Sequence, residues 1–167
     1  RLVGSEMCIR DRYMTSRQVV AVNADSGIET LADLAGKTMM VQSTTKPEEI
    51  FLAGTDPRIP QLGEVLSTED RSVQYAMLNC GYVDAVAAHE TAILQYMQDC
   101  NANFRILEEP LLVTGIGVAF ALNDTRGLDS QLTKTFAAMR ADGTMKQIVG
   151  KYLPDPEKYL EVDALEP

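Results

Sequence analysis

One histidine and one carboxylate stand side by side where a short apolar segment of the sequence ends. His89 and Glu90 directly follow the apolar run at 83–88. Such a pair can bind a small polar molecule, because a buried ammonium group needs a neighbouring carboxylate to offset its loss of hydration. The structural alternative is that Glu90 complements the positive end of a helix dipole and that His89 is a packed, hydrogen-bonded residue.

A second group of polar side chains follows another apolar run, at 37–42. Gln42 is followed by the three hydroxyl residues Ser43, Thr44 and Thr45, and a proline with two acidic residues then marks the start of a helix. Together they form a strand–loop–helix unit with a hydroxyl-rich loop at the carboxyl end of the strand. The structural interpretation is that these hydroxyl groups only cap the helix.

Other chemistry is not supported by the residues. The sequence contains no Ser-His-Asp order and no phosphate-binding glycine loop, and its single histidine lacks a cysteine or second histidine at metal-binding spacing. We therefore predict no catalytic residue, no metal and no cofactor. Cys80 and Cys100 each end an apolar helical stripe, so they are either two buried thiols or, in an oxidising compartment, a disulfide.

The elements that must position these residues alternate along the chain. Apolar runs bounded by turns predict strands near 18–22, 37–42, 64–66, 83–88, 104–107 and 114–122. Stripes at helical spacing predict helices near 70–80, 90–100, 127–141 and 145–153, followed by a loose acidic tail. The stripe of the first of these helices is Val73, Ala76, Met77 and Cys80. This order predicts an α/β fold with a parallel or mixed sheet, in which ligands bind at the carboxyl ends of the strands.

Composition limits the partners. The chain has 167 residues, is 46% apolar and carries a net charge of −9, which argues against nucleic acid and against an anionic membrane surface. The first twelve residues show no clear period and resemble a translated sequencing-adapter read-through. We expect residues 1–12 to be a non-native segment, with the natural N-terminus and any signal peptide lying upstream.

Five short motifs occur in an order typical of one protein family. They are the run 28–37, the run 41–45, Leu78 with 81–85, the run 115–120 and the run 141–144. From about Met14 to Pro154 the sequence resembles the bacterial extracellular solute-binding proteins of family 3, the amino-acid receptors of ABC importers. The resemblance implies a type II periplasmic-binding-protein clamshell, of which this chain would hold the complete lobe II plus the C-terminal part of lobe I.

The resemblance also divides the chain. Residues 13–23 would be the end of lobe I and the first crossover, 24–109 would be lobe II, 110–154 the second crossover and the returning lobe I helices, and 155–167 a C-terminal tail. Glu90 matches the acid that pairs with the ligand's ammonium group, and His89 has counterparts that contact the ligand. Ser43, Thr44, Thr45 and, with less weight, Gln42 match the loop that holds the ligand's carboxylate, although the glycine expected there is absent. The arginine that relatives contribute from lobe I would lie in the missing part.

The implied function is a receptor that acts without catalysis. It would bind an amino acid or a similar polar solute, deliver it to a membrane permease, and work as a monomer in the periplasm or as a cell-surface lipoprotein. Two alternatives share the fold. A prephenate-type dehydratase would carry a carboxylate where this sequence has Ile93, and an extracellular sensor module of a kinase or chemoreceptor would continue into a membrane segment.

Overall fold

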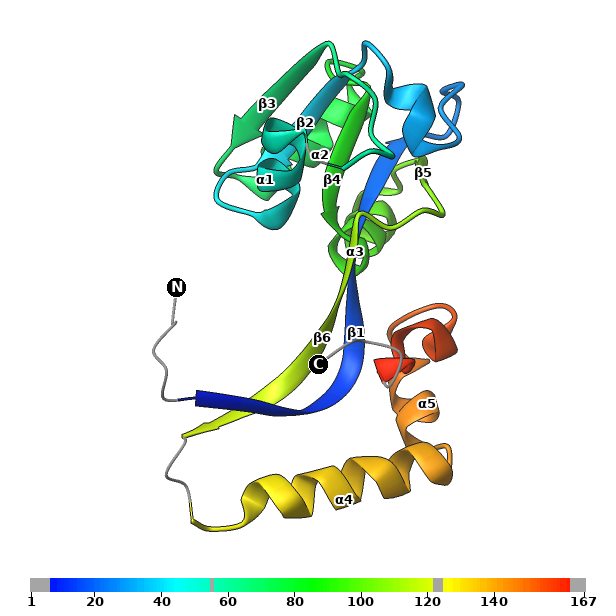
Figure 1. Cartoon of the computed structure of the whole chain (residues 1–167). Coiled ribbons are helices and arrows are strands. Elements are labelled where there is room, and N and C mark those ends of the chain that lie inside the picture. The colour runs from blue at the N-terminus through cyan, green and yellow to red at the C-terminus, as the bar shows by residue number, and fades with distance from the viewer. Residues whose placement is uncertain (1–6, 55, 122–124, 163–167) are drawn as a thin grey trace. The chain divides into compact units, whose positions relative to one another are not determined.

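The computed structural model describes residues 7–54, 56–121 and 125–162 (Figure 1). The predictions made for residues 1–6, for Leu122 and for 163–167 lie outside these residues. The chain divides into two compact units: a central unit of residues 17–112, and a terminal unit that combines 1–16 with 113–167. Each unit is described by itself.

The central unit is built on a mixed sheet. Its strands are β1 (Met7–Asn23), which begins in the terminal unit, β2 (Thr38–Gln42), β3 (Glu64–Thr68), β4 (Ala85–His89) and β5 (Phe104–Ile106). Their order across the sheet is β3-β2-β4-β1-β5. β2 runs parallel to β3 and β4, whereas β1 is antiparallel to β4 and β5. The predicted mixed sheet is therefore confirmed.

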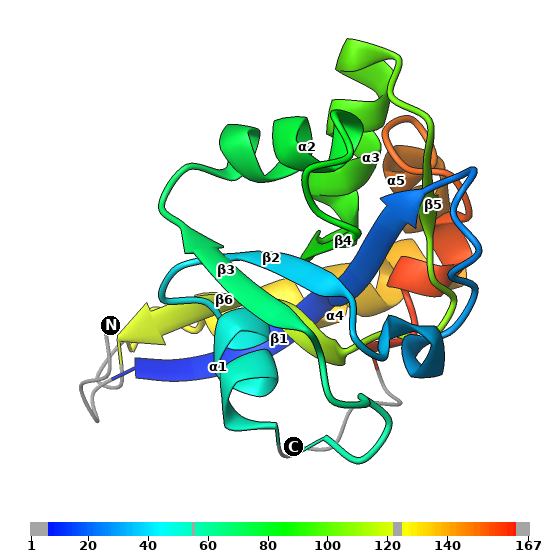
Figure 2. The same cartoon turned by 90° about the horizontal axis from the view of Figure 1, so that it is seen from above.

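Helices cover both faces of this sheet, which explains the continuous apolar runs of β1 and β4. One face carries the short 3-10 helix η1 (Leu31–Leu34) and α1 (Lys46–Ala53); the other carries α2 (Arg71–Asn79) and α3 (Glu90–Cys100) (Figure 2). Alternate residues of β1 enter opposite cores: Val20 and Val22 pack with Phe51, while Val19 and Ala21 pack with residues of α2 and α3.

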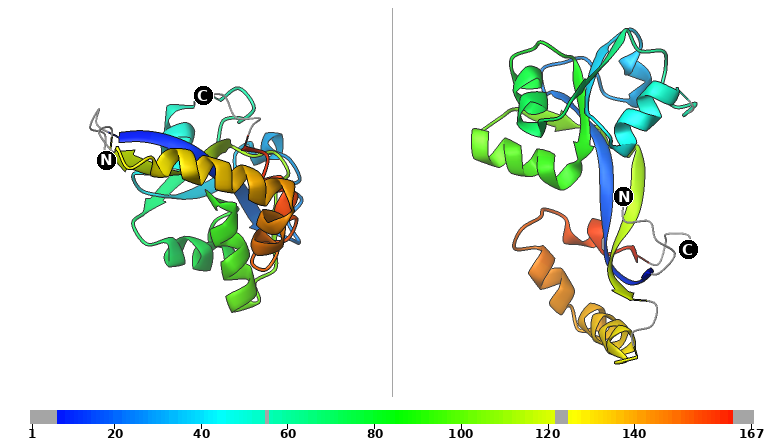
Figure 3. Two further views of the ribbon diagram at one scale, coloured as in Figure 1. Left: turned by 90° about the horizontal axis from the view of Figure 1, so that it is seen from below. Right: turned by 90° about the vertical axis from the view of Figure 1, so that its left-hand side faces the viewer.

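The terminal unit contains the remaining elements. β6 (Leu112–Ala121) pairs with β1, and it is followed by α4 (Leu128–Ala141), α5 (Thr144–Val149) and a second 3-10 helix, η2 (Pro156–Tyr159) (Figure 3). No residue of α4 is buried; its Phe136 ring lies 5.7 Å from the ring of Tyr13 in β1. None of the helices in the described part of the chain combines the length and the apolar character needed to cross a membrane.

Several sequence-based expectations were wrong in detail. The first strand begins at Met7, whereas the pattern predicted it only from Gln18. The last helix ends at Val149 because the chain turns at Gly150. The acidic tail is not loose throughout, since η2 places Tyr159 in the interior at 1% exposure.

The buried face of α2 also differs from the prediction. Val73 is 44% exposed, while the interior side of the helix consists of Gln74, Tyr75 and Leu78. The helix therefore faces the sheet one residue further along than the apolar stripe indicated. Gln74 fits there because its amide nitrogen donates to the carbonyl groups of Met40 (3.0 Å) and Ala87 (2.8 Å), so burial leaves that nitrogen satisfied.

Candidate ligand-binding site

The candidate site lies along one edge of the central sheet, where β2, β3 and β4 end. β2 and β3 stay in register to their last residues, Gln42 and Thr68, and β4 ends at His89. Because β1 is antiparallel to β4, its residue Gln18 lies opposite His89. We call this set of strand ends, with the loop after β2 and the start of α2, the carboxyl edge. The sequence predicted the site at such an edge.

His89 is half-buried at this edge and lies against Gln18. The Nε2 atom of Gln18 is 3.0 Å from Nε2 of the imidazole. Burial, and behind it the positive charge of Arg71, lowers the pKa of His89 below its ordinary value of 6.5. The ring is therefore neutral at pH 7, and it can both donate and accept a hydrogen bond.

Glu90 is the first residue of α3 and is 3% exposed. Its Oε2 atom lies 3.2 Å from Nε of Arg17 in β1, so the carboxylate is balanced by a guanidinium within the central unit. The sequence did not predict this ion pair, since the two residues are far apart along the chain. The ion pair with Arg17 therefore orients the Glu90 side chain without the help of a ligand.

The loop of the three hydroxyl residues Ser43, Thr44 and Thr45, called the hydroxyl loop, continues directly from β2. Ser43 donates its N–H to the carbonyl of Thr68 at 2.8 Å, and the Thr45 hydroxyl donates to the carbonyl of Gln42 at 2.6 Å. Thr44 adopts a left-handed conformation with φ of 62°, which is uncommon for a β-branched residue. The glycine expected in this loop would adopt that conformation without strain, so Thr44 carries backbone strain instead.

Glu48, the first acidic residue after this loop, also accepts hydrogen bonds. Glu48 accepts hydrogen bonds from the Ser67 hydroxyl at 2.5 Å and from the N–H of Thr44 at 2.6 Å, and these two bonds lower the pKa of its carboxyl group. Thr45 is the N-cap residue of α1 by backbone position, but its side chain makes no capping hydrogen bond. The simple capping interpretation of the hydroxyl residues therefore does not hold for Thr45.

Arg71 is the site residue that the sequence reasoning missed. Its Nε and Nη2 atoms donate to Oε1 of Gln42 at 3.2 and 3.0 Å, and Nε2 of Gln42 donates to the carbonyl of Glu69 at 3.2 Å. Asp70 caps α2 through the N–H of Ser72 and so begins the helix at Arg71. A signal was available: Arg71 opens the helix that follows a strand, as Glu90 does.

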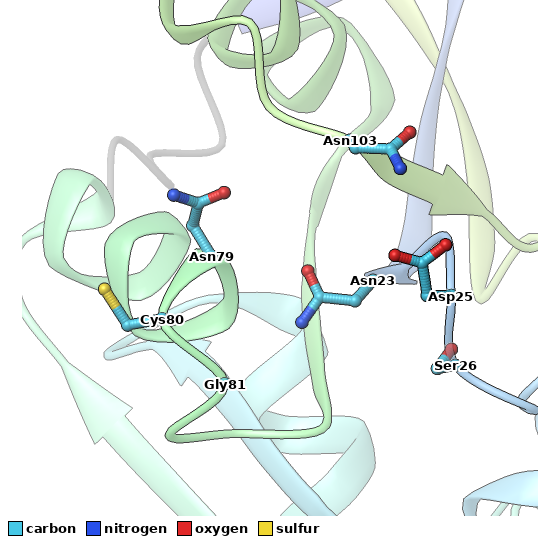
Figure 4. A pocket seen from close by; sticks show the side chains of 7 residues that line it. All are labelled: Asn23, Asp25, Ser26, Asn79, Cys80, Gly81 and Asn103. Atoms are coloured by element: carbon cyan, nitrogen blue, oxygen red, sulfur yellow. The ribbon is translucent and has the colours of Figure 1, made fainter.

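A hollow of about 290 Å³ accompanies the loop. It is lined by residues of the loop and of α1: Thr44, Thr45, Lys46, Glu48, Glu49 and Leu52. A larger pocket of about 550 Å³ lies at the opposite edge of the sheet, where β1 ends and β4 begins (Figure 4). Its lining is polar and comprises Asn23, Asp25, Ser26, Asn79, Cys80, Gly81 and Asn103. None of the predicted ligand-contacting residues lines this larger pocket.

Cys80 lines the pocket of Figure 4, away from the carboxyl edge, and Cys100 is the last residue of α3, which begins at that edge. Both are exposed free thiols, so the expectation of two buried thiols was wrong. Burial raises the pKa of the Tyr96 hydroxyl, and interactions with Cys100 and Cys80 raise it further, so both thiols lie near this side chain. Among the described residues, no group of three or more side chains is arranged to hold a metal ion.

Together, these contacts place a neutral imidazole, a guanidinium, an ion-paired carboxylate and a row of hydroxyl and N–H groups at one sheet edge. Such a set can bind a small zwitterion through hydrogen bonds and charge pairing. Ile93, at the position where the dehydratase alternative needs a carboxylate, is fully buried in the core beneath α3.

Comparisons with known proteins agree with this architecture. A scan against models of protein families finds no match. The histidine-binding periplasmic proteins of Salmonella typhimurium and of Escherichia coli K12 are each 32% identical over 145 residues, which are 82% of this chain and 54% of those proteins. The chain thus spans about half the length of the curated relatives that it matches.

Solved structures show the same fold. The second substrate-binding domain of an amino-acid ABC transporter from Streptococcus pneumoniae, 24% identical, has a TM-score of 0.73 over 90% of this chain and 66% of that one. The substrate-binding protein of another amino-acid ABC transporter, 25% identical, has a TM-score of 0.62 over 89% of this chain and 64% of its own. Over the part of those proteins that it spans, the chain is similar in sequence to the histidine-binding periplasmic proteins and shares its fold with substrate-binding proteins of amino-acid ABC transporters.

Proposed function

We propose that the protein carrying this chain is the substrate-binding component of an ABC importer for an amino acid or a similar small polar solute. The observation that carries the proposal is the carboxyl edge, where Gln18, Arg71 and His89 lie beside the hydroxyl loop. The curated relatives are histidine-binding periplasmic proteins, which supports an amino acid as the ligand.

The individual residues are assigned as follows. The loop of Ser43, Thr44 and Thr45 holds the ligand's α-carboxylate through the donors that its own hydrogen bonds leave available, among them the hydroxyl group of Ser43. Gln42 positions Arg71 rather than contacting the ligand by itself. Glu90 neutralises the ligand's ammonium group. A carboxylate accepts several hydrogen bonds, so the contact of Arg17 with Oε2 is compatible with this role.

The wider assignments follow from the same relatives. We place the protein outside the cytoplasm, in the periplasm or on the cell surface as a lipoprotein, and we expect it to be a monomer that docks on a membrane permease. No cofactor and no chemical step are required. The buried Ile93 supports this over a dehydratase, because that position offers no carboxylate.

The test uses the protein in its natural length. Thermal unfolding is measured against a panel of amino acids, short peptides and organic acids. A ligand at a hundred times its Kd stabilises the folded state by about 2.7 kcal/mol, which raises the Tm by several degrees. Mass spectrometry of the incubated ligand should return it unchanged. The proposal fails if no member of the panel raises the Tm, or if the ligand is converted.

The assignment of Glu90 has its own test. Glu90→Gln should weaken the binding of an amino acid much more than that of its 2-hydroxy analogue, which lacks the ammonium group. Equal losses for both compounds would remove Glu90 from direct ligand contact and leave it only its pairing with Arg17.

A further inference from the structure

Arg71 is held in a fixed position at the carboxyl edge. Two of its N–H groups point at one oxygen, Oε1 of Gln42, and the other end of the same amide is tied to the carbonyl of Glu69. Hydrogen bonds therefore fix both the oxygen and the nitrogen of the Gln42 amide. A guanidinium has five N–H donors, so further donors remain to bind an acceptor on a ligand, while the side chain itself is exposed.

Three acids of this edge have hydrogen-bond or ion-pair partners other than Arg71. The carboxylate of Asp70 is occupied at the N-cap of α2, where the N–H and the hydroxyl of Ser72 donate to it. Glu48 is bonded to the loop and to β3, and Glu90 is paired with Arg17. The charge of Arg71 reaches His89, where it acts with burial against protonation of the ring.

The position of Arg71 differs from that of the groups assigned to the α-carboxylate. Those groups belong to the loop after β2, whereas Arg71 lies on α2, beyond Gln42 and on the side of His89. A zwitterion held at the loop would therefore direct a second group toward the guanidinium. A carboxylate is the group that a guanidinium fork binds best, and a cationic group would be repelled.

We propose that Arg71 is a specificity-determining residue that binds the side-chain carboxylate of an acidic amino acid and excludes amino acids with cationic side chains. This inference rests on the proposed function, because it assigns the ligand class of the same site. Gln42 acts through Arg71 as a positioning residue, since it contacts the guanidinium with its only amide oxygen.

Calorimetric titration of the natural-length protein with glutamate, aspartate, alanine, lysine and arginine tests the proposal. The wild-type protein should bind glutamate or aspartate at least roughly tenfold more tightly than lysine or arginine, as expected for a charge-assisted hydrogen bond. Arg71→Gln should lose roughly tenfold or more in affinity for the acidic ligands, while the affinities for alanine and lysine stay the same or rise. Arg71→Lys keeps the charge but loses the two-pronged guanidinium, so its affinity for the acidic ligands should lie between those of the wild-type protein and Arg71→Gln.

Lys37→Gln is the matched control, because it removes one positive charge beside the opposite end of β2. It should leave every affinity unchanged. The Arg71 proposal is overturned, with the transport function intact, if lysine or arginine binds best, if Arg71→Gln behaves like Lys37→Gln, or if Arg71→Gln weakens alanine as much as glutamate. Should none of these five amino acids bind the wild-type protein, the Arg71 proposal is overturned, and the thermal-unfolding panel decides separately on the transport function.

Discussion

The Nε atom of Arg17 lies 3.2 Å from Oε2 of Glu90, and this ion pair ties β1 to the first residue of α3. The Glu90 side chain is 4% exposed and that of Arg17 is 17% exposed. Nη2 of Arg17 also donates to the carbonyl of Glu108 at 3.2 Å. A single guanidinium thus fastens three segments of the central unit beside the candidate site.

Removing Arg17 should therefore be costly. Arg17→Gln leaves the buried carboxylate of Glu90 without its counter-charge, and we expect the free energy of unfolding to fall by about 3 kcal/mol, as for other buried pairs that lose one partner. Urea unfolding followed by circular dichroism measures this. Lys46→Gln is the control: it breaks a Lys46–Glu49 pair whose side chains are 62% and 66% exposed, so its effect should be about 0.5 kcal/mol or less. Similar small losses for both variants would contradict a supporting role for the Arg17–Glu90 pair.

His89 offers a direct measurement of the electrostatics of the site. It is the only histidine in the sequence, so its ring resonances in a proton NMR titration need no assignment. We expect an apparent pKa below 6.5, because burial and then Arg71 disfavour the charged ring. Arg71→Gln should raise this pKa without restoring the ordinary value, since burial remains, and Lys37→Gln should leave it unchanged. A pKa at or above 6.5 in the wild-type protein would contradict this description.

The same shift predicts how stability depends on pH. The folded-state pKa of His89 is depressed, so the unfolded chain takes up a proton at a higher pH than the folded chain does. The stability associated with neutral His89 is therefore fully present above about pH 6.5 and is lost as the pH falls through the folded-state pKa. His89→Gln should remove this part of the pH dependence below about pH 6.5, which urea titrations at each pH would show. An unchanged pH profile of stability in His89→Gln would show that other groups cause the loss of stability at low pH.

The strained loop residue Thr44 gives a further prediction. Thr44 has φ of 62°, a conformation that glycine adopts freely. Thr44→Gly should keep the stability of the protein within about 1 kcal/mol or raise it, because relief of strain offsets the added freedom of the unfolded chain. Thr45→Gly, one residue later, should instead lose about 1 kcal/mol, because its φ is −107° and its hydroxyl bonds the carbonyl of Gln42. Thermal unfolding of the two variants compares them, and the reverse order would contradict strain at Thr44.

The cysteines can be tested by oxidation. Cys80 and Cys100 are exposed, and both act on the hydroxyl of Tyr96, so we expect their thiols to lie near each other. Treatment with a disulfide oxidant such as oxidised glutathione should join them, with loss of two hydrogens per chain, and the bridged peptide should appear in a non-reducing digest. Cys100→Ser should abolish the bridge and leave Cys80 reactive toward a thiol reagent. Mixed glutathione adducts without a bridge would show that the two thiols cannot meet.

The sequence predicted the main elements of the site because they depend on local patterns. Apolar runs ending in polar residues marked β2 and β4, and parallel strands necessarily bring Gln42 and His89 to the same edge. What it missed depends on contacts between distant segments. The Arg71–Gln42 and Arg17–Glu90 contacts join different elements, and no periodicity reports such pairs.

The orientation of α2 was missed for a related reason. The apolar stripe placed Val73 inside, but Gln74 is buried instead because two backbone carbonyl groups of the sheet accept from its amide. An apolarity pattern treats glutamine as a surface residue and cannot register that its amide nitrogen is satisfied by the sheet. The length of β1 was missed because residues 7–17 have no alternation, and they form a strand through pairing with β6.

The division of the chain has a consequence for the order of events during synthesis. The central unit is continuous, whereas the terminal unit is assembled from both ends of the chain. On the ribosome, the continuous central unit can therefore fold as soon as it has emerged, before β6 and the helices that follow it have been made. The pairing of β1 with β6 is added only after synthesis has passed Ala121, the last residue of β6.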